Sequence, residues 1–432
     1  MSVRQNAMLL AVLTVLIAVM GDWAFDSSVS RFWRLPAGLL LVGLVYEALS
    51  VRRWRLAASV TAAEKWPLGT TQRLTWHFSH QARRSLLIEF APAAPAAVDI
   101  DGSVRSLHVP ADGAASLEAW ALPRRLGPVQ WPPMQARIAG PLGLAWWPAP
   151  LQPSGGARVV PDLLRPGERS VGRLATGPRA SLTTGAGTEV LQLRAFRAGD
   201  ALRAVDWKAT ARRRELICRD VLEDQHLTIL IALDAGRGSG QWAGGLDQLG
   251  HYINAAARFA QHAVANDDQV GLVVYGDKPL AVMAPQRGAA AVTKIRSLLA
   301  EAQVQPVDSN PLLAATCIRG LIRQRALVIM LTEPEDASGE GQLVRALDLL
   351  QAQHLVFVVG VAAAADDQLA SAPARDWLDP YYALAALERR RQRDRNLRAL
   401  QARGVPAIVA RPEQLQAALI AAYTGFRRRH RV

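Results

Sequence analysis

The stretch LTILIALD, at residues 227–234, is an apolar run that ends in an aspartate. Such a run, without polar alternation, is typical of a strand that is buried on both faces of a parallel sheet. Similar runs follow at 269–276, 326–333, 354–361 and 405–410. Helix-length segments lie around and between them, at 246–265, 288–302, 311–324, 340–352, 380–402 and 412–427. The alternation predicts a doubly wound α/β domain over residues 226–432.

Polar residues follow these strands at the sheet edge where ligands of such folds bind. Asp234 ends the first run and Glu333 ends the run at 326–333, while Ser309 lies on another loop. Carboxylate and hydroxyl oxygens suit Mg²⁺, so Asp234, Ser309 and Glu333 are the candidate metal residues. The same loop carries a G-x-G-x-x-A string at 238–243, but Asp234 would face a pyrophosphate there. A dinucleotide site is therefore not expected.

Residues 57–160 contain short patterned runs separated by turn signals. Runs that suit strands lie at 74–80, 85–90, 103–109, 116–122 and 134–139. Their spacing predicts a small, all-β, sandwich-like domain.

The first 56 residues carry two apolar runs, at 7–20 and 35–46, with aromatic residues near their ends. Aromatic residues anchor helices at the headgroups, so we expect a transmembrane hairpin with spans of about 5–24 and about 32–51. A cleaved signal peptide is the rival interpretation, but no A-x-A-like site follows the first run.

Flanking basic residues favour both ends of the hairpin on the cytoplasmic side. They predict a multi-pass protein of the inner membrane whose bulk is cytoplasmic, in contact with the lipid bilayer. Glu47 lies near the end of the second run. We expect its carboxylate to reach the membrane interface, with a functional intramembrane acid as the alternative.

The net charge of +13 is unevenly distributed. Residues 165–219 carry +7, residues 220–387 carry −8 and residues 388–432 carry +9. Five carboxylates stand among the twelve cations of 165–219. They would repel phosphates, so we expect no nucleic acid and favour ion pairing or protein docking. The basic tail from Glu388 is expected to be a solvated helix, with contact to anionic lipid as the alternative.

The most distinctive stretch lies in the linking segment 161–225. It interleaves basic, acidic and aromatic residues between 185 and 223, and its motif positions are Glu189, Arg194, Gly199, Asp200, Arg203, Asp206, Trp207, Lys208, Ala211 and Arg212. This pattern resembles the signature of the family called domain of unknown function 58. GPLGL at 140–144 and the end of the chain at 404–423 resemble the same family. One departure is Gly140, where the family commonly has aspartate.

The resemblance implies a membrane-anchored protein with a von Willebrand factor A-like domain. The metal-ion-dependent adhesion site of such domains uses Asp-x-Ser-x-Ser, a Thr and an Asp. Here Gly236 and Gly238 stand where both serines should be, so the resemblance implies a degenerate site. It also implies a partner, because such proteins commonly accompany AAA+ ATPases of the MoxR type.

Three functions stay open at this point. The first is a non-enzymatic interaction or scaffold protein that assists a MoxR-type ATPase in chaperone-like assembly or maturation. The second is a Mg²⁺-dependent ligand-binding module, and the third is a nucleic-acid-binding membrane protein. The motifs of P-loop ATPases, serine hydrolases and zinc proteases are absent from the sequence, so we expect neither an enzyme nor a bound cofactor.

Overall fold

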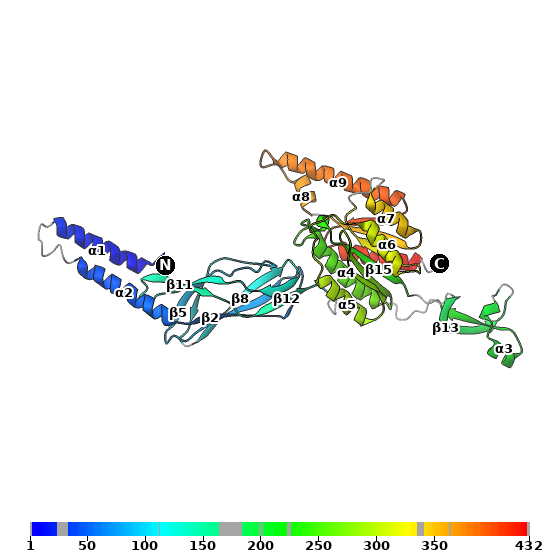
Figure 1. Cartoon of the computed structure of the whole chain (residues 1–432), viewed down its shortest axis with the longest axis horizontal. Coiled ribbons are helices and arrows are strands. Elements are labelled where there is room, and N and C mark those ends of the chain that lie inside the picture. Colours follow the sequence, from blue (N-terminus) through cyan, green and yellow to red (C-terminus); the bar gives the residue numbers. More distant parts are fainter. Residues whose placement is uncertain are drawn as a thin grey trace. The chain divides into compact units, whose positions relative to one another are not determined.

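The computed structural model describes residues 2–23, 33–111, 113–163, 184–197, 200, 202–222, 226–334, 341–362 and 364–429. Contacts between residues divide the chain into two compact units, Met1–Asp162 and Leu163–Val432. Figure 1 shows helices and a β-rich part in the first unit, and an α/β part in the second. The β-rich region and the α/β region that the sequence predicts are both confirmed.

Two apolar helices open the chain, α1 (Gln5–Trp23) and α2 (Arg34–Arg53), and they pack side by side. Within the described residues, only α2 is long and apolar enough to cross a membrane. The apolar part of α1, Gln5–Met20, is shorter. The expectation of two membrane spans is therefore not supported, because the first apolar run is too short.

The β-rich part contains a five-stranded sheet in the order β1-β11-β10-β5-β7, a four-stranded sheet β2-β4-β8-β6 and a three-stranded sheet β3-β12-β9. Its core holds Trp66, Trp76, Phe78 and Phe90, all fully buried. The strands are β1 (Ser2–Val3), β2 (Leu56–Ala62), β3 (Lys65–Pro67), β4 (Gln72–His80), β5 (Leu86–Phe90), β6 (Val98–Ile100), β7 (Arg105–Val109), β8 (Ala114–Pro123), β9 (Gly127–Gln130), β10 (Met134–Ala139), β11 (Ala145–Leu151) and β12 (Gly156–Val160).

Glu47 joins α2 to the turn between β10 and β11. Its side chain is 0% exposed, and its carboxylate accepts hydrogen bonds from the backbone N–H groups of the turn. The donors are Leu142 at 2.9 Å, Leu144 at 3.0 Å, Ala145 at 3.1 Å and the indole Nε1 of Trp147 at 3.1 Å. The structure therefore does not support a Glu47 carboxylate that extends to headgroups or water, because protein donors solvate it instead.

The family motif begins the described part of the second unit as a small ribbon. β13 (Thr184–Ala195) pairs with β14 (Ile217–Leu222) in an antiparallel ladder. Between them lie a 3₁₀ turn, η3 (Leu202–Ala204), and the short helix α3 (Trp207–Arg213). The basic motif thus forms its own hairpin and helix before the α/β part begins.

The α/β part is built on a six-stranded sheet in the order β17-β16-β15-β18-β19-β20. All neighbouring strands are parallel except β16 and β17. The central strands are buried along their length, because helices cover both faces. The strands are β15 (Thr228–Asp234), β16 (Gln269–Tyr275), β17 (Pro279–Gln286), β18 (Leu327–Leu331), β19 (Leu355–Val361) and β20 (Ala407–Ala410).

The helices of this part follow the sequence-based ranges closely, except for α8, which the sequence analysis did not predict. They are α4 (Gln248–Val264), α5 (Ala289–Ala300), α6 (Pro311–Leu321), α7 (Gln342–Gln351), α8 (Ala364–Ser371), α9 (Asp379–Ala402) and α10 (Leu415–Arg429), with a 3₁₀ turn η4 (Arg237–Gly240). The strand order reverses between β15 and β18. This reversal places a crevice outside the carboxyl ends of both strands, and such a crevice is where ligands bind in open α/β sheets.

Candidate functional site

Asp234 lies at the carboxyl end of β15, where the strand order reverses. Its Oδ1 accepts a hydrogen bond from the backbone N–H of Gly236 at 2.8 Å. Its Oδ2 accepts one from Ser309 Oγ at 2.9 Å and one from Thr332 Oγ1 at 2.7 Å. The carboxylate therefore ties together three segments: its own loop, the loop before α6 and the end of β18.

The sequence analysis found one of the two hydroxyl partners of Asp234 and missed the other. Ser309 was a sequence-based candidate, and the structure brings it to Asp234. Thr332 was missed, although a lone hydroxyl in the apolar run 326–333 was a usable signal. Glu333, the third candidate, points to another partner.

The side chain of Asp234 is buried, and burial raises the pKa of its carboxyl. The hydrogen bonds from Gly236, Thr332 and Ser309 act in the opposite direction, but desolvation is the larger effect. A buried carboxyl with three donors and a raised pKa is held in a fixed orientation. Its oxygens already accept hydrogen bonds, so it is poorly suited to bind another ligand.

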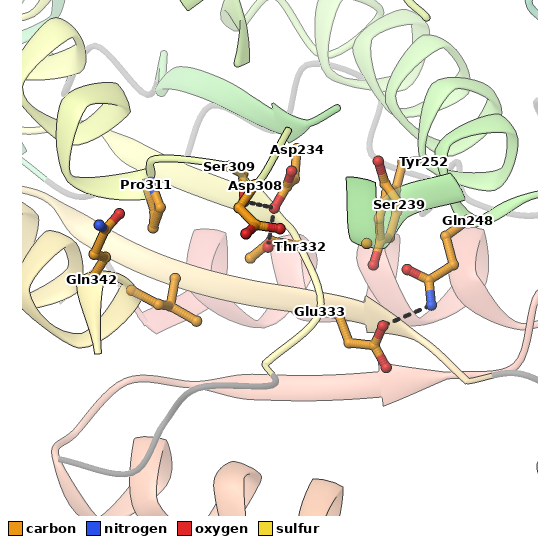
Figure 2. A pocket seen from close by; sticks show the side chains of 12 residues that line it. Asp234, Ser239, Gln248, Tyr252, Asp308, Ser309, Pro311, Thr332, Glu333 and Gln342 are labelled. Atoms are coloured by element: carbon orange, nitrogen blue, oxygen red, sulfur yellow. Dashed lines mark hydrogen bonds between the residues drawn. The ribbon is translucent and has the colours of Figure 1, made fainter. Parts of the chain in front are cut away.

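A pocket of about 360 Å³ opens beside Asp234 (Figure 2). Its walls come from the β15 loop, the start of α4, the loop before α6, the end of β18 and the start of α7. The lining residues are Asp234, Gly238, Ser239, Gln248, Tyr252, Asp308, Ser309, Pro311, Thr332, Glu333, Gln342 and Leu343. The predicted residues Asp234, Ser309 and Glu333 thus line one pocket.

Glu333 and Gln248 form the second polar contact of this pocket. Gln248 Nε2 donates to Glu333 Oε2 at 2.8 Å, as Figure 2 shows. Gln248 is only 1% exposed, and its Oε1 has no hydrogen-bond partner in the described structure. A buried amide oxygen without a partner is costly, so it needs an explanation. Nothing in the sequence marks Gln248 as a site residue.

The donor set does not fit a Mg²⁺ ion of the kind that the family resemblance implies. A Cβ atom at residue 236 would come within 2.8 Å of both Cβ and the backbone N of Ser309, so a serine ligand cannot stand there. At Gly238 nothing lies within 4 Å. Among the described residues, no group of three or more His, Cys, Asp or Glu side chains could hold a metal ion.

Backbone hydrogen bonds hold the loop before α6 against the position of Gly236. The backbone N–H of Arg237 donates to the carbonyl of Val307 at 2.8 Å, and that of Gln305 donates to the carbonyl of Ala235 at 2.7 Å. The loop before α6 therefore lies directly on the β15 loop. It fills the space that a first-loop hydroxyl ligand would need.

The family motif is held by its own charged residues. Arg194 pairs with Asp200 through Nη1 and Nη2, at 2.7 and 2.8 Å. The Arg194 side chain and the backbone N–H of Arg197 hold the pKa of Asp200 well below its usual range. A bidentate pair of this kind fixes the relative orientation of its two side chains, here those of Arg194 and Asp200.

Asp206 caps α3 by accepting from the backbone N–H groups of Lys208 and Ala209, each at 3.0 Å. These bonds lower the pKa of Asp206. The next residue, Trp207, is 66% exposed, and Lys208, Ala211 and Arg212 are exposed on the same helix. The side chains of Glu189 and Arg203, and the whole of Gly199, lie outside the described part of the chain.

Comparison with protein families gives one match. Residues 192–399 match the model described as protein of unknown function DUF58. This match supports the assignment of the chain to that family. It begins inside the family motif and continues through most of the α/β part. No curated protein matches the chain.

Several solved structures share limited similarity with parts of the chain. One is the CARDB domain of the PF1109 protein from Pyrococcus furiosus, in complex with di-metal ions, with 10% identity, a TM-score of 0.17, 25% of this chain and 89% of that chain. Another is an uncharacterised membrane-spanning protein from Vibrio fischeri, with 14% identity, a TM-score of 0.18, 46% of this chain and 98% of that chain. With TM-scores this low, neither similarity indicates a function.

Proposed function

We propose that the chain is a non-enzymatic, membrane-anchored interaction protein that docks onto an AAA+ ATPase of the MoxR type and assists chaperone-like assembly or maturation. The observation that carries the proposal is the exposed Trp207 on the capped helix α3. Exposed tryptophan beside exposed basic residues is the composition of protein-binding hot spots. The MoxR-type partner follows from the family resemblance.

The α3 surface, defined by Trp207, Lys208, Ala211 and Arg212, is suited to docking because its backbone is held in place. Asp206 caps its first turn, and Arg214 ends it in the left-handed conformation with φ of 56°. Thr210 Oγ1 accepts from the backbone N–H of Ile217 at 3.0 Å, which fastens the helix to β14. Burial of Trp207 against a partner therefore costs this helix little backbone conformational entropy.

The membrane anchor in this proposal is α2, with the shorter α1 packed beside it. Both helices expose large apolar side chains along their length, among them Leu9, Leu16, Leu39 and Val45. Continuous exposed apolar surface on adjacent helices supports contact with lipid. Basic residues in the last turn of α2, Arg52 and Arg53, support a cytoplasmic position for the β-rich and α/β parts.

We also propose that the α/β part is a von Willebrand factor A-like domain. Three features support it: the strand order, the antiparallel strand β17 at one edge, and Asp234 at the end of a central strand beside hydroxyl groups from two other segments. Its pocket differs from a metal-ion-dependent adhesion site in the closed position at Gly236.

The test is co-purification of the full chain with its cognate ATPase from detergent-solubilised membranes, with and without ATP. We expect Trp207→Ala to lower recovery at least about tenfold, as for a hot-spot truncation. Trp120→Ala is the matched control, because Trp120 is 61% exposed but lies on β8 of the other unit. The proposal fails if the wild-type chain recovers no ATPase, or if both variants recover equal amounts.

A further inference from the structure

The pocket beside Asp234 has the electrostatic character of a cation site. Three carboxyl groups line it, from Asp234, Asp308 and Glu333, together with hydroxyl groups of Ser239, Ser309 and Thr332. Among its described lining residues there is no lysine, arginine or histidine. Asp308 also pairs with Arg237 at 2.9 Å on the open side, where both side chains are exposed.

The buried acceptor in the wall of this pocket is an independent sign of a ligand. Gln248 Oε1 is shielded from water and has no partner, while the amide nitrogen of the same side chain is engaged with Glu333. This engagement fixes the orientation of the amide and leaves its oxygen as an acceptor in the pocket wall. A ligand that donates a hydrogen bond at this place would remove the cost of the unpaired oxygen.

The arrangement of the loops around Asp234 does not favour a metal ion in this pocket. The position of the first hydroxyl ligand is filled by the Ser309 loop, and both oxygens of Asp234 already accept hydrogen bonds. Glu333 and the Oε1 atom of Gln248 are both acceptors in the pocket wall, and a planar cation with several N–H donors can bond to both.

We propose that this pocket binds a guanidinium group, supplied by an arginine side chain of a protein partner. Taking the arginine from a partner rests on the proposed interaction function. A guanidinium presents five N–H donors in a fixed fork, which matches a carboxylate on one edge and a further acceptor on another. A carboxylate has about four lone-pair sites, so Glu333 can accept from Gln248 and from the guanidinium together.

The pocket is also large enough for the head group of an arginine side chain. Its volume of about 360 Å³ lies within the usual range for ligand pockets.

The experiment is calorimetric titration of the full chain in detergent micelles with Nα-acetyl-arginine amide. The matching citrulline amide, which is planar but uncharged, and MgCl₂ alone are titrated in parallel. We expect saturable binding of the arginine probe only. Glu333→Gln should weaken it at least about tenfold, because a hydrogen-bonded ion pair becomes a neutral contact. Gln248→Met, which removes the orphan acceptor at similar volume, should weaken it several-fold.

Asp277→Asn is the matched control, because Asp277 is an exposed carboxylate outside the pocket lining. The inference is overturned if the arginine probe does not bind, if citrulline binds equally well, or if Glu333→Gln and Asp277→Asn have the same effect. Saturable Mg²⁺ binding that excludes the arginine probe would also overturn it.

The two proposals fail separately. If the arginine probe does not bind but recovery of the ATPase still depends on Trp207, the guanidinium site is wrong and the interaction function stands. If the probe binds in a Glu333-dependent way but no ATPase is recovered, the guanidinium site stands and the ATPase proposal is wrong.

Discussion

The carboxylate of Glu47 occupies the space in which a side chain at residue 140 would begin. Glycine is the residue that lets helix α2 bring this carboxylate against the turn between β10 and β11. The buried acid at this turn is thus supplied by another segment of the chain. The turn obtains a carboxylate from α2 instead of from its own residues.

The first prediction tests this contact. Gly140→Ala should lower the free energy of unfolding of the first unit by about 1–3 kcal/mol, because the added methyl group displaces Glu47. Thermal unfolding in detergent micelles measures the effect. Gly38→Ala is the control, since nothing lies within 4 Å of a Cβ at this position of α2. If Gly140→Ala and Gly38→Ala unfold alike, Glu47 is not packed as described.

The second prediction concerns the two glycines after Asp234. Gly236→Ser should destabilise the α/β part by about 1–3 kcal/mol, because its Cβ collides with Ser309. Gly238→Ser should change stability by no more than about 0.5 kcal/mol, because its position is open. Adding MgCl₂ should not raise the melting temperature of a double variant that carries both Gly236→Ser and Gly238→Ser. A clear rise would mean that the loops can rearrange into a metal site.

The third prediction is a pH dependence. The folded pKa of Asp234 is raised from 3.8, so the protonated form is favoured in the folded state. The stability from this group is complete below the unfolded pKa and is lost as pH rises through the folded pKa. Asp234→Asn should therefore show a flatter dependence of stability on pH than the wild type. Urea unfolding between about pH 4 and about pH 8 measures the difference.

Asp268, whose pKa burial also raises, contributes the same slope to the wild type and to Asp234→Asn. The difference between the two profiles therefore isolates Asp234. An unchanged slope would show that Asp234 titrates alike in the folded and unfolded states.

The fourth prediction concerns the attachment of α10. The carboxylate of Asp268 is 0% exposed, and it accepts from the Tyr423 hydroxyl and from Arg427 Nη1. Tyr423→Phe should cost about 1–3 kcal/mol, because a buried carboxylate loses a donor. Tyr381→Phe, at an exposed position of α9, should be neutral in the same urea unfolding experiment. Equal stabilities would argue against a structural role for the Tyr423 hydroxyl.

The continuous strands of the α/β part were predictable because burial on both faces leaves an unbroken apolar run. β17 was missed for the converse reason. It is an edge strand with alternating exposure, and it begins at a proline directly after a turn. The register of such a strand is set by its neighbour β16 and not by its own pattern.

The candidate site was predictable only in part. Asp234 and Glu333 follow apolar runs, so the rule on strand ends finds them. Gln248 lies at the start of a helix, and its importance arises from burial that only tertiary packing reveals. The partners of Glu47 were likewise invisible, because they lie about a hundred residues further along the chain. Contacts of that separation leave no periodic trace in a single sequence.

The contact between Glu47 and the β10–β11 turn has a mechanical consequence. α2 leads into β2 after a connection of only two residues, Trp54 and Arg55, and Glu47 fastens the helix to the β-rich part at a second point. Two attachment points resist rotation where one does not. If α2 lies in a bilayer, a change in its tilt, from bilayer thickness or lateral pressure, is transmitted to the β-rich part as a rigid rotation.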